Sequence, residues 1–349
     1  MAGKRHHYIP RFLQRGFLTG LPKKEFTHVY LKGGEQRTIK IDKVGVEGYF
    51  YSVDREAELD DIFTDLEGIY ASAISILRTN PQGDINKSIL AEIISHLEVR
   101  TNNLRKSFHS SSEGFLNKMI DSFTSVDVIK PLIKNEISKN INSCGILGNL
   151  FDNMKVPIQY REMLSEQILP LVNANLDQNL NVYMERIKES FNLKISKRLK
   201  NVIKQGHING MLKHVAENSK VDIYKGLNYK VIKTDFDVIL GDSIIVFEFE
   251  DCEEFKPFYD VKNTLKAIYF PIETNIFIYA SKDDSEAKLK ILNEMIAKCS
   301  KDFFIASKSS EHLTELQRSI GNNCDLLTDS EIQQILDDVI QEQVAKFSV

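Results

Sequence analysis

Apolar residues recur three and four positions apart over much of the first two thirds of the chain. This is the spacing of one face of an α-helix. The clearest run lies between residues 58 and 79, where the apolar positions are Leu59, Ile62, Phe63, Leu66, Ile69, Tyr70, Ala73 and Leu77. The same period predicts helices over about 87–108, 112–123, 126–140, 157–190 and 191–217. The pattern therefore predicts a block of helices over residues 58–218.

Shorter β-prone segments lie on both sides of this block. Before it, 27–31 and 37–41 flank Gly33-Gly34, which predicts a hairpin that needs another surface to lie on. After it, strands are predicted over 221–224, 229–232, 236–240, 244–249, 276–279 and 303–305. Helices are predicted over 284–299, 309–320 and 329–344. A helical block with a mostly antiparallel sheet flanked by helices is an α+β fold.

The pattern also predicts how the chain is divided. We expect a single interlocked domain over 1–349, with an N-terminal arm and hairpin over 1–57, the helical block over 58–218 and the sheet with its helices over 219–349. A chain of 349 residues is long enough to bury one large core. Because no segment repeats at a fixed period, a solenoid is excluded.

Composition and charge narrow the class of protein. Hydrophobic residues make up 42% and charged residues 27%, as in ordinary globular proteins. A formal net charge of -4 excludes a globally basic nucleic-acid coat but leaves room for a local basic groove. No run approaches eighteen apolar residues, and no apolar stretch follows the basic N-terminal residues. We therefore expect a cytoplasmic protein with no membrane span.

The four cysteines are too far apart in sequence for a Cys-x-x-Cys zinc pair. In a chain of this length they do not form a disulfide framework either. We expect reduced, structural thiols at Cys144, Cys252, Cys299 and Cys324.

Two adjacent histidines near the start of the chain are the first candidate site. His6 and His7 are each a potential proton carrier or metal ligand, because imidazole titrates near neutral pH. Pro10 keeps Ile9 out of helical geometry, so residues 6–10 should be extended, with alternate side chains on opposite faces. Ile9 should seek the core, which predicts that His7 points inward and that His6 lies nearer solvent.

Glu67 and Arg100 lie close to the apolar stripes of the first two predicted helices. A carboxylate near a buried face needs a cation, a donor or a metal to offset desolvation. A guanidinium suits either a bidentate carboxylate pair or a phosphate. Two readings remain open: a buried Glu67–Arg100 ion pair that joins two helices, or a polar pocket shared with His7.

Acidic residues near the predicted strands supply the last candidates. Asp242 follows Gly241 at the end of a strand, where it is either a site residue or a turn aspartate that binds its own backbone. The alternating acids Asp235, Asp237, Glu248 and Glu250 resemble a restriction-type nuclease pattern, but the lysine of Glu-x-Lys is missing. For these four we expect a solvated strand face.

Several short blocks resemble a known family. They are His6-His7-Tyr8-Ile9-Pro10-Arg11-Phe12-Leu13 with Phe17, Tyr49-Phe50-Tyr51 with Leu66-Glu67, Leu97 through Arg100-Thr101 and Arg105, Leu240 to Val246, Phe270-Pro271-Ile272, and Leu292-Asn293. The opening block resembles the His-His-Tyr-Val-Pro-type signature of the bacterial domain of unknown function numbered 4238. Gly241 and Ser243-Ile244 depart from that family's Ser-Asp-Asn-Pro-type turn. The resemblance implies a fold and a cluster of polar positions, and it implies no activity.

Two functional hypotheses follow. In the first, the chain is a hydrolase of the nuclease type that acts on phosphodiesters, with catalytic residues drawn from His6, His7, Glu67, Arg100 and Asp242. Its cofactor stays open, with a divalent metal as one candidate, and nucleic acid is its candidate partner. In the second, the chain is a non-catalytic regulatory or sensor module whose polar cluster is structural. Convergence of the five side chains in an open cleft favours the enzyme, and scattering or burial favours the module.

Overall fold

A computed structural model describes residues 5–20, 24–51, 58–124, 130–131, 134–135, 146–217, 220–250, 254–283 and 285–347. Contacts between Cα atoms divide the chain into two compact units. Unit 1 comprises residues 1–111 and 201–328, and unit 2 comprises residues 112–200 and 329–349. The helices α4 (Asn102–Thr124) and α7 (Ile158–Glu217) contribute residues to both units.

The described residues of unit 1 form three antiparallel sheets. The smallest pairs β1 (Arg5–His7) with β4 (Val46–Gly48). The second has the order β3 (Gln36–Lys40), β2 (Phe26–Leu31), β10 (Phe303–Ala306) and β6 (Leu240–Gly241). The third has the order β5 (Asn228–Lys233), β9 (Ile276–Ser281), β8 (Leu265–Glu273) and β7 (Val246–Phe249).

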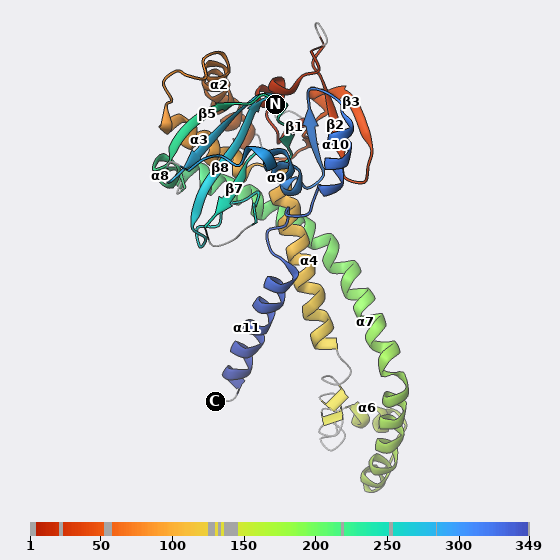
Figure 1. The fold of residues 1–349 in the computed structure, drawn as a ribbon. Coiled ribbons are helices and arrows are strands. Elements are labelled where there is room, and N and C mark those ends of the chain that lie inside the picture. The colour runs from red at the N-terminus through yellow and green to blue at the C-terminus, as the bar shows by residue number, and fades with distance from the viewer. Residues whose placement is uncertain are drawn as a thin grey trace. The chain divides into compact units, whose positions relative to one another are not determined.

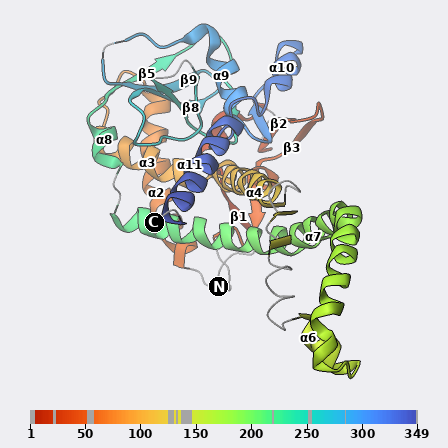
Figure 2. The ribbon, with the colours of Figure 1, turned by 90° about the horizontal axis from the view of Figure 1, so that it is seen from below.

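The predicted N-terminal hairpin is present and is supported by the C-terminal part of the chain. Gly33 and Gly34 both have φ of 98°, a left-handed conformation that side chains disfavour. Strand β10 pairs with β2 from Phe303 to Ala306, which supplies the surface that the hairpin needs. Figure 2 shows the hairpin beside the helix α10 (Glu311–Leu316).

The third sheet is covered on both faces, as Figure 1 shows. On β9, Ile276, Ile278 and Ala280 belong to a core shared with the helices α2 (Glu58–Thr79) and α3 (Lys87–Val99). The alternate residues Phe277 and Tyr279 belong to a second core shared with α9 (Leu292–Cys299). Because both faces are buried, the central strands are almost continuously apolar rather than alternating.

One strand of this sheet was not predicted, and one predicted strand is a helix. The unpredicted strand β8 contains Pro271, at an irregularity of the β8–β9 ladder between Pro271 and Glu273. A proline is tolerated there because the ladder is already interrupted. The predicted strand 221–224 is instead the short helix α8 (Val221–Lys225). Val221 and Tyr224 are three residues apart and both are buried, so helical geometry places them on one inward face.

The helical predictions were mostly right in position and wrong at several boundaries. The remaining short helices of unit 1 are α1 (Arg11–Gln14), η1 (Arg15–Phe17), η2 (Ile41–Lys43), η3 (Leu289–Ile291) and η4 (Gln317–Ser319). The helix expected over 87–108 is two helices, because Arg100 is the C-cap of α3 and α4 starts at Asn102. The helices expected over 157–190 and 191–217 form one helix, α7, with Pro170 inside it.

Unit 2 consists of helices in the described residues. It contains the C-terminal part of α4, α6 (Ile146–Asn153), most of α7 and α11 (Asp329–Phe347). Lys188 of α7 lies 3.1 Å from Asp121 of α4, and Lys118 donates a hydrogen bond to the carbonyl of Asp329. The helix predicted over 126–140 falls mostly outside the described residues.

The fold is therefore α+β, with helices and antiparallel sheets and a C-terminal sheet flanked by helices, as predicted. The single interlocked domain stays a prediction. Cys299 and Cys324 are free and buried, while Cys144 and Cys252 lie outside the described residues. Among the helices that the structure describes, none combines the length and the apolar character needed to cross a bilayer.

Candidate functional site

The N-terminal arm enters the core through β1 and a bend. In β1, His6 lies opposite Glu47 and His7 lies opposite Val46. The backbone bends at Tyr8 and Ile9, whose N–H groups both point to the carbonyl of Gly45. The bend breaks the alternation expected over 6–10. Residues on the two sides of it therefore do not keep the faces that an extended strand would give them.

His6 is the buried histidine, which corrects the prediction that His7 points inward. His6 is 2% exposed, and its ring stacks on Tyr51 with centroids 5.1 Å apart. Its Nδ1 accepts a hydrogen bond from the backbone N–H of Tyr51 at 3.0 Å. Its Nε2 lies 3.8 Å from a carboxylate oxygen of Asp60 in α2. The imidazole thus joins three parts of unit 1 instead of facing solvent.

His7 contributes mainly its backbone. Its side chain is half-buried, and burial together with nearby Arg11 lowers the pKa of the imidazole. Its carbonyl oxygen accepts one hydrogen bond from the Tyr51 hydroxyl at 3.0 Å and one from Arg100 Nη2 at 2.7 Å. The carbonyl is therefore the group through which His7 reaches Arg100.

Arg100 is the centre of the cluster, and its guanidinium is 1% exposed. Nε donates to the Tyr51 hydroxyl at 2.9 Å, and Nη2 donates both to His7 and to Glu67 Oε1 at 2.7 Å. Nη1 lies 3.1 Å from Nε2 of His96, whose pKa burial holds well below its usual value. A neutral His96 accepts this bond. Arg100 therefore has its ion-pair partner and its hydrogen-bond acceptors within the protein.

Glu67 forms an ion pair with Arg100. Its carboxylate is 30% exposed. The ion pair joins α2 to the C-terminal cap of α3, as the first of the two readings predicted. Tyr51 stands beside the pair, and burial raises the pKa of its hydroxyl to about 12. We call His6, His7, Tyr51, Glu67, His96 and Arg100 the arm cluster.

A second buried arginine, Arg105, binds the backbone beside Tyr51 of the arm cluster. Arg105 of α4 donates to Nδ1 of His207 at 3.0 Å and to the carbonyl of Phe50 at 2.7 Å. Its guanidinium carbon lies 3.6 Å from the centroid of the Phe50 ring. Nε2 of His207 donates to the carbonyl of Val99 at 2.7 Å. Burial and the charge of Arg105 lower the pKa of His207 to about 3, so this imidazole is neutral.

Asp242 occupies a different place in unit 1. It is 2% exposed, and its carboxylate accepts hydrogen bonds from the backbone N–H groups of Lys301, Asp302 and Phe303, at 2.7, 2.7 and 3.3 Å. These bonds fix the start of β10 against the turn after β6. Burial and the nearby charge of Asp302 raise the pKa of Asp242 to about 7. Asp242 therefore binds the loop that enters β10, while the other four predicted residues meet in the arm cluster.

The acidic strand residues divide between core and surface. Glu248 was expected on a solvated face but is 4% exposed, because its strand β7 is covered on both sides. Its carboxylate lies 2.8 Å from Lys266 and 3.0 Å from Lys288, and it accepts a hydrogen bond from Tyr269.

Within the described part of the chain, no group of three or more histidine, cysteine or acidic side chains is arranged to hold a metal ion.

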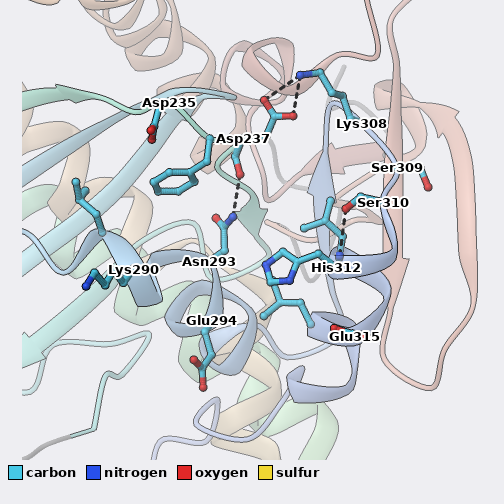
Figure 3. Close-up of a pocket in the computed structure, with 14 residues that line it drawn as sticks. Asp235, Asp237, Lys290, Asn293, Glu294, Lys308, Ser309, Ser310, His312 and Glu315 are labelled. Carbon is cyan, nitrogen blue, oxygen red and sulfur yellow. Dashed lines mark hydrogen bonds and ion pairs between the residues drawn. The ribbon is translucent and has the colours of Figure 1, made fainter.

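An open cleft in unit 1 was not predicted from the sequence. Its volume is about 800 Å³, and Figure 3 shows the side chains that line it. They come from the segment before β6, from η3 and α9, and from α10 with the turn before it: Asp235, Phe236, Asp237, Leu289, Lys290, Asn293, Glu294, Lys308, Ser309, Ser310, His312, Leu313, Glu315 and Leu316. We call it the α9–α10 cleft. Of its lining residues, Asp235 and Asp237 were singled out in the sequence, but only as acidic residues that alternate along a predicted strand.

Comparison with known proteins places the chain in a family. Neither the curated proteins nor the solved structures include a significant match. The sequence profile of the family described as a protein of unknown function (DUF4238) matches residues 5–325, which include the whole arm cluster and the α9–α10 cleft. The chain therefore belongs to this family, which is the family that the sequence resembled.

Proposed function

We propose that this protein is a non-catalytic regulatory or sensor module and that its arm cluster is structural. One observation carries the proposal: Arg100 is buried, and its donors go to His7, Tyr51, Glu67 and His96. A guanidinium that grips a substrate phosphate needs N–H groups that face solvent. The cluster uses these groups to hold the arm against α2 and α3.

The other predicted catalytic residues support the same proposal. His6 is buried against Tyr51 and uses Nδ1 to bind a backbone N–H group, which removes that nitrogen as a proton acceptor. Asp242 satisfies the backbone of residues 301–303. A hydrolytic site requires a base, an acid or a metal within reach of one substrate atom. The burial and the separate locations of these groups favour a module over a hydrolase.

The proposal is tested by a direct search for phosphodiester hydrolysis. The full 349-residue chain is incubated with bis(4-nitrophenyl) phosphate, and separately with single-stranded and double-stranded DNA and RNA. Each reaction contains Mg²⁺, Mn²⁺ or Zn²⁺, and heat-unfolded protein is the control. We expect no turnover above that control with any substrate or metal.

Two variants make the test specific to the predicted site. Glu67→Gln and His7→Gln preserve side-chain size, and both side chains are partly exposed, so we expect the variants to fold. Hydrolysis by the unaltered protein that either variant abolishes, with an unchanged unfolding midpoint, would establish catalysis at the arm cluster. Hydrolysis that elutes with the protein and survives both substitutions would also overturn the non-catalytic proposal, because it would place catalysis elsewhere in the chain.

A further inference from the structure

The α9–α10 cleft has the dimensions of a site for a small ligand. Its volume of about 800 Å³ lies within the range of roughly 300–1,000 Å³ that is common for small-molecule sites. Its lining residues include no member of the arm cluster. An inference about the cleft is therefore independent of the function proposed above.

The walls of the cleft are held in place by hydrogen bonds. The side-chain amide of Asn293 donates to the carbonyl of Asp237 at 2.8 Å and accepts from the N–H of Ile239 at 3.1 Å, as the close-up in Figure 3 illustrates for Asp237. On the opposite wall, Ser310 caps α10 by accepting from the N–H of Leu313. A wall fixed in this way loses little conformational freedom when a ligand binds.

Apolar side chains supply one part of the surface. Phe236, Leu313 and Leu316 contribute from two walls, and Leu289 of η3 is 39% exposed at the cleft. Burial of such surface against an apolar ligand is favourable in proportion to the area removed from water. The cleft therefore suits a ligand with an apolar body.

Acidic side chains give the cleft its charge. Four carboxylates (Asp235, Asp237, Glu294 and Glu315) and two ammonium groups (Lys290 and Lys308) line it, for a formal charge of -2 among the lining residues, although Glu294 is also paired at 2.6 Å with Lys298 outside the lining. Lys308 lies 2.9 Å from the carboxylate of Asp237, so this pair is largely neutralised. Asp235 and Glu315 are exposed on different walls. A cleft lined by an excess of one charge raises the local concentration of ligands of the opposite charge.

From this combination we propose that the α9–α10 cleft binds a small amphiphilic organic cation. The apolar body of the ligand packs against Phe236, Leu289 and Leu313. Its protonated amine is attracted by the excess of carboxylates, among which Asp235 and Glu315 are exposed. The recognition is by charge and apolar area, so an anion with the same body is rejected.

Two small commercial compounds test the effect of the ligand's charge separately from that of its apolar body. 4-Phenylbutylamine and 4-phenylbutyrate share an aryl-alkyl body and carry opposite charges at neutral pH. Each is titrated against the full chain by saturation-transfer-difference NMR at low salt. We expect saturable binding of the amine, with an affinity at least about tenfold above that of the carboxylate. We expect added salt to weaken the binding of the amine, because exposed charges are screened.

Matched substitutions locate the binding. Glu315→Gln should weaken amine binding about twofold to fivefold, as expected for one partly solvated charge. Glu311→Gln on the same helix, outside the lining, should leave it unchanged. Leu289→Ser should weaken binding, whereas Ile291→Ser should not, although the two residues share η3 and are 39% and 38% exposed. Unfolding curves verify that each variant is folded.

Three outcomes would overturn the proposal. The first is the absence of saturable binding by either probe. The second is equal affinity for the amine and the carboxylate, which would remove the charge argument. The third is binding of the amine that is unaffected by both Glu315→Gln and Leu289→Ser, which would place the ligand elsewhere. None of these outcomes bears on whether the arm cluster is catalytic.

Discussion

Replacing Arg100 by methionine tests the structural role of the arm cluster most directly. Methionine has a similar length but no donor. Nε2 of His96 therefore loses its hydrogen bond, while the Tyr51 hydroxyl and the His7 carbonyl each lose one bond and keep the bond that joins them. Each unsatisfied buried group costs about 1–3 kcal/mol. Glu67 is 30% exposed and can be rehydrated, which limits its share of the cost. We expect Arg100→Met to lower the free energy of unfolding by about 3–5 kcal/mol, the range for a broken buried pair.

The measurement is urea unfolding followed by far-UV circular dichroism, with hydrogen exchange at the arm. A loss of this size is a large fraction of the roughly 5–15 kcal/mol that stabilises an ordinary protein. Exchange should rise at the amide of Tyr51, which is bonded to His6, and along β1. Arg37→Met is the matched control, because Arg37 also pairs with a glutamate but lies on the surface. It should leave the unfolding midpoint unchanged.

The partner variant sharpens the prediction. Glu67→Gln retains an oxygen that can accept from Arg100 and leaves an exposed amide, so it should cost clearly less than Arg100→Met. A free-energy change below about 1 kcal/mol for Arg100→Met would refute the reasoning, because His96 would be left without its donor and Tyr51 and His7 would each lose one hydrogen bond in the core. Equal losses for the two variants would contradict the burial difference between Arg100 and Glu67.

Three further predictions concern stability. His6→Ala should lower the free energy of unfolding by about 2–3 kcal/mol, because the hydrogen bond to Tyr51 and the ring contact are lost. His7→Ala should lower it by less than about 1 kcal/mol, because the His7 carbonyl remains. A larger loss for His7→Ala than for His6→Ala in urea unfolding would contradict the structure. The pKa of His207 is about 3 in the folded protein and about 6.5 in the unfolded chain. Between these two pH values the unfolded chain binds a proton that the folded protein does not. Up to about 5 kcal/mol of stability should therefore be lost as the pH falls from 6.5 towards 3. His207→Gln should flatten this slope in unfolding curves at several pH values, and an unchanged slope would exclude His207 as its source. Asp242→Asn should cost about 1–3 kcal/mol in thermal unfolding, because an amide replaces carboxylate oxygens that bind three backbone N–H groups; an unaltered melting temperature would argue against that role.

Local pattern was sufficient for α2, the hairpin and the strand β9, but not for the strand β8, the helix α8 or several helix boundaries. The apolar spacing from Leu59 to Leu77 predicted the helix α2, because that helix presents one face to the core. Strand β8 was missed since it is buried on both faces and contains Pro271. The sequence of β8 therefore lacks the alternation of apolar and polar residues that marks a half-buried strand.

The same distinction applies to the candidate site. The Glu67–Arg100 pair could be predicted because each residue lies beside the apolar stripe of its own helix, and two such helices pack together. The orientation of His6 and His7 could not, because the bend at residues 8–9 depends on the carbonyl of Gly45, more than thirty residues away in sequence. The partners of Asp242 lie about sixty residues away, at 301–303. Short-range patterns carry no information about such contacts.

Exposure separates the two polar regions of unit 1 more clearly than residue type does. The arm cluster contains histidines, a glutamate and an arginine, which are common catalytic side chains, yet its central guanidinium is committed to internal partners. The α9–α10 cleft contains ordinary surface acids, but Asp235 and Glu315 are exposed beside apolar side chains in a pre-formed concavity. A ligand gains free energy only from groups that it can reach and desolvate. On the proposal that the arm cluster is structural, the histidine segment serves to hold the N-terminal arm, and we expect ligand recognition where polar groups and apolar area are accessible together.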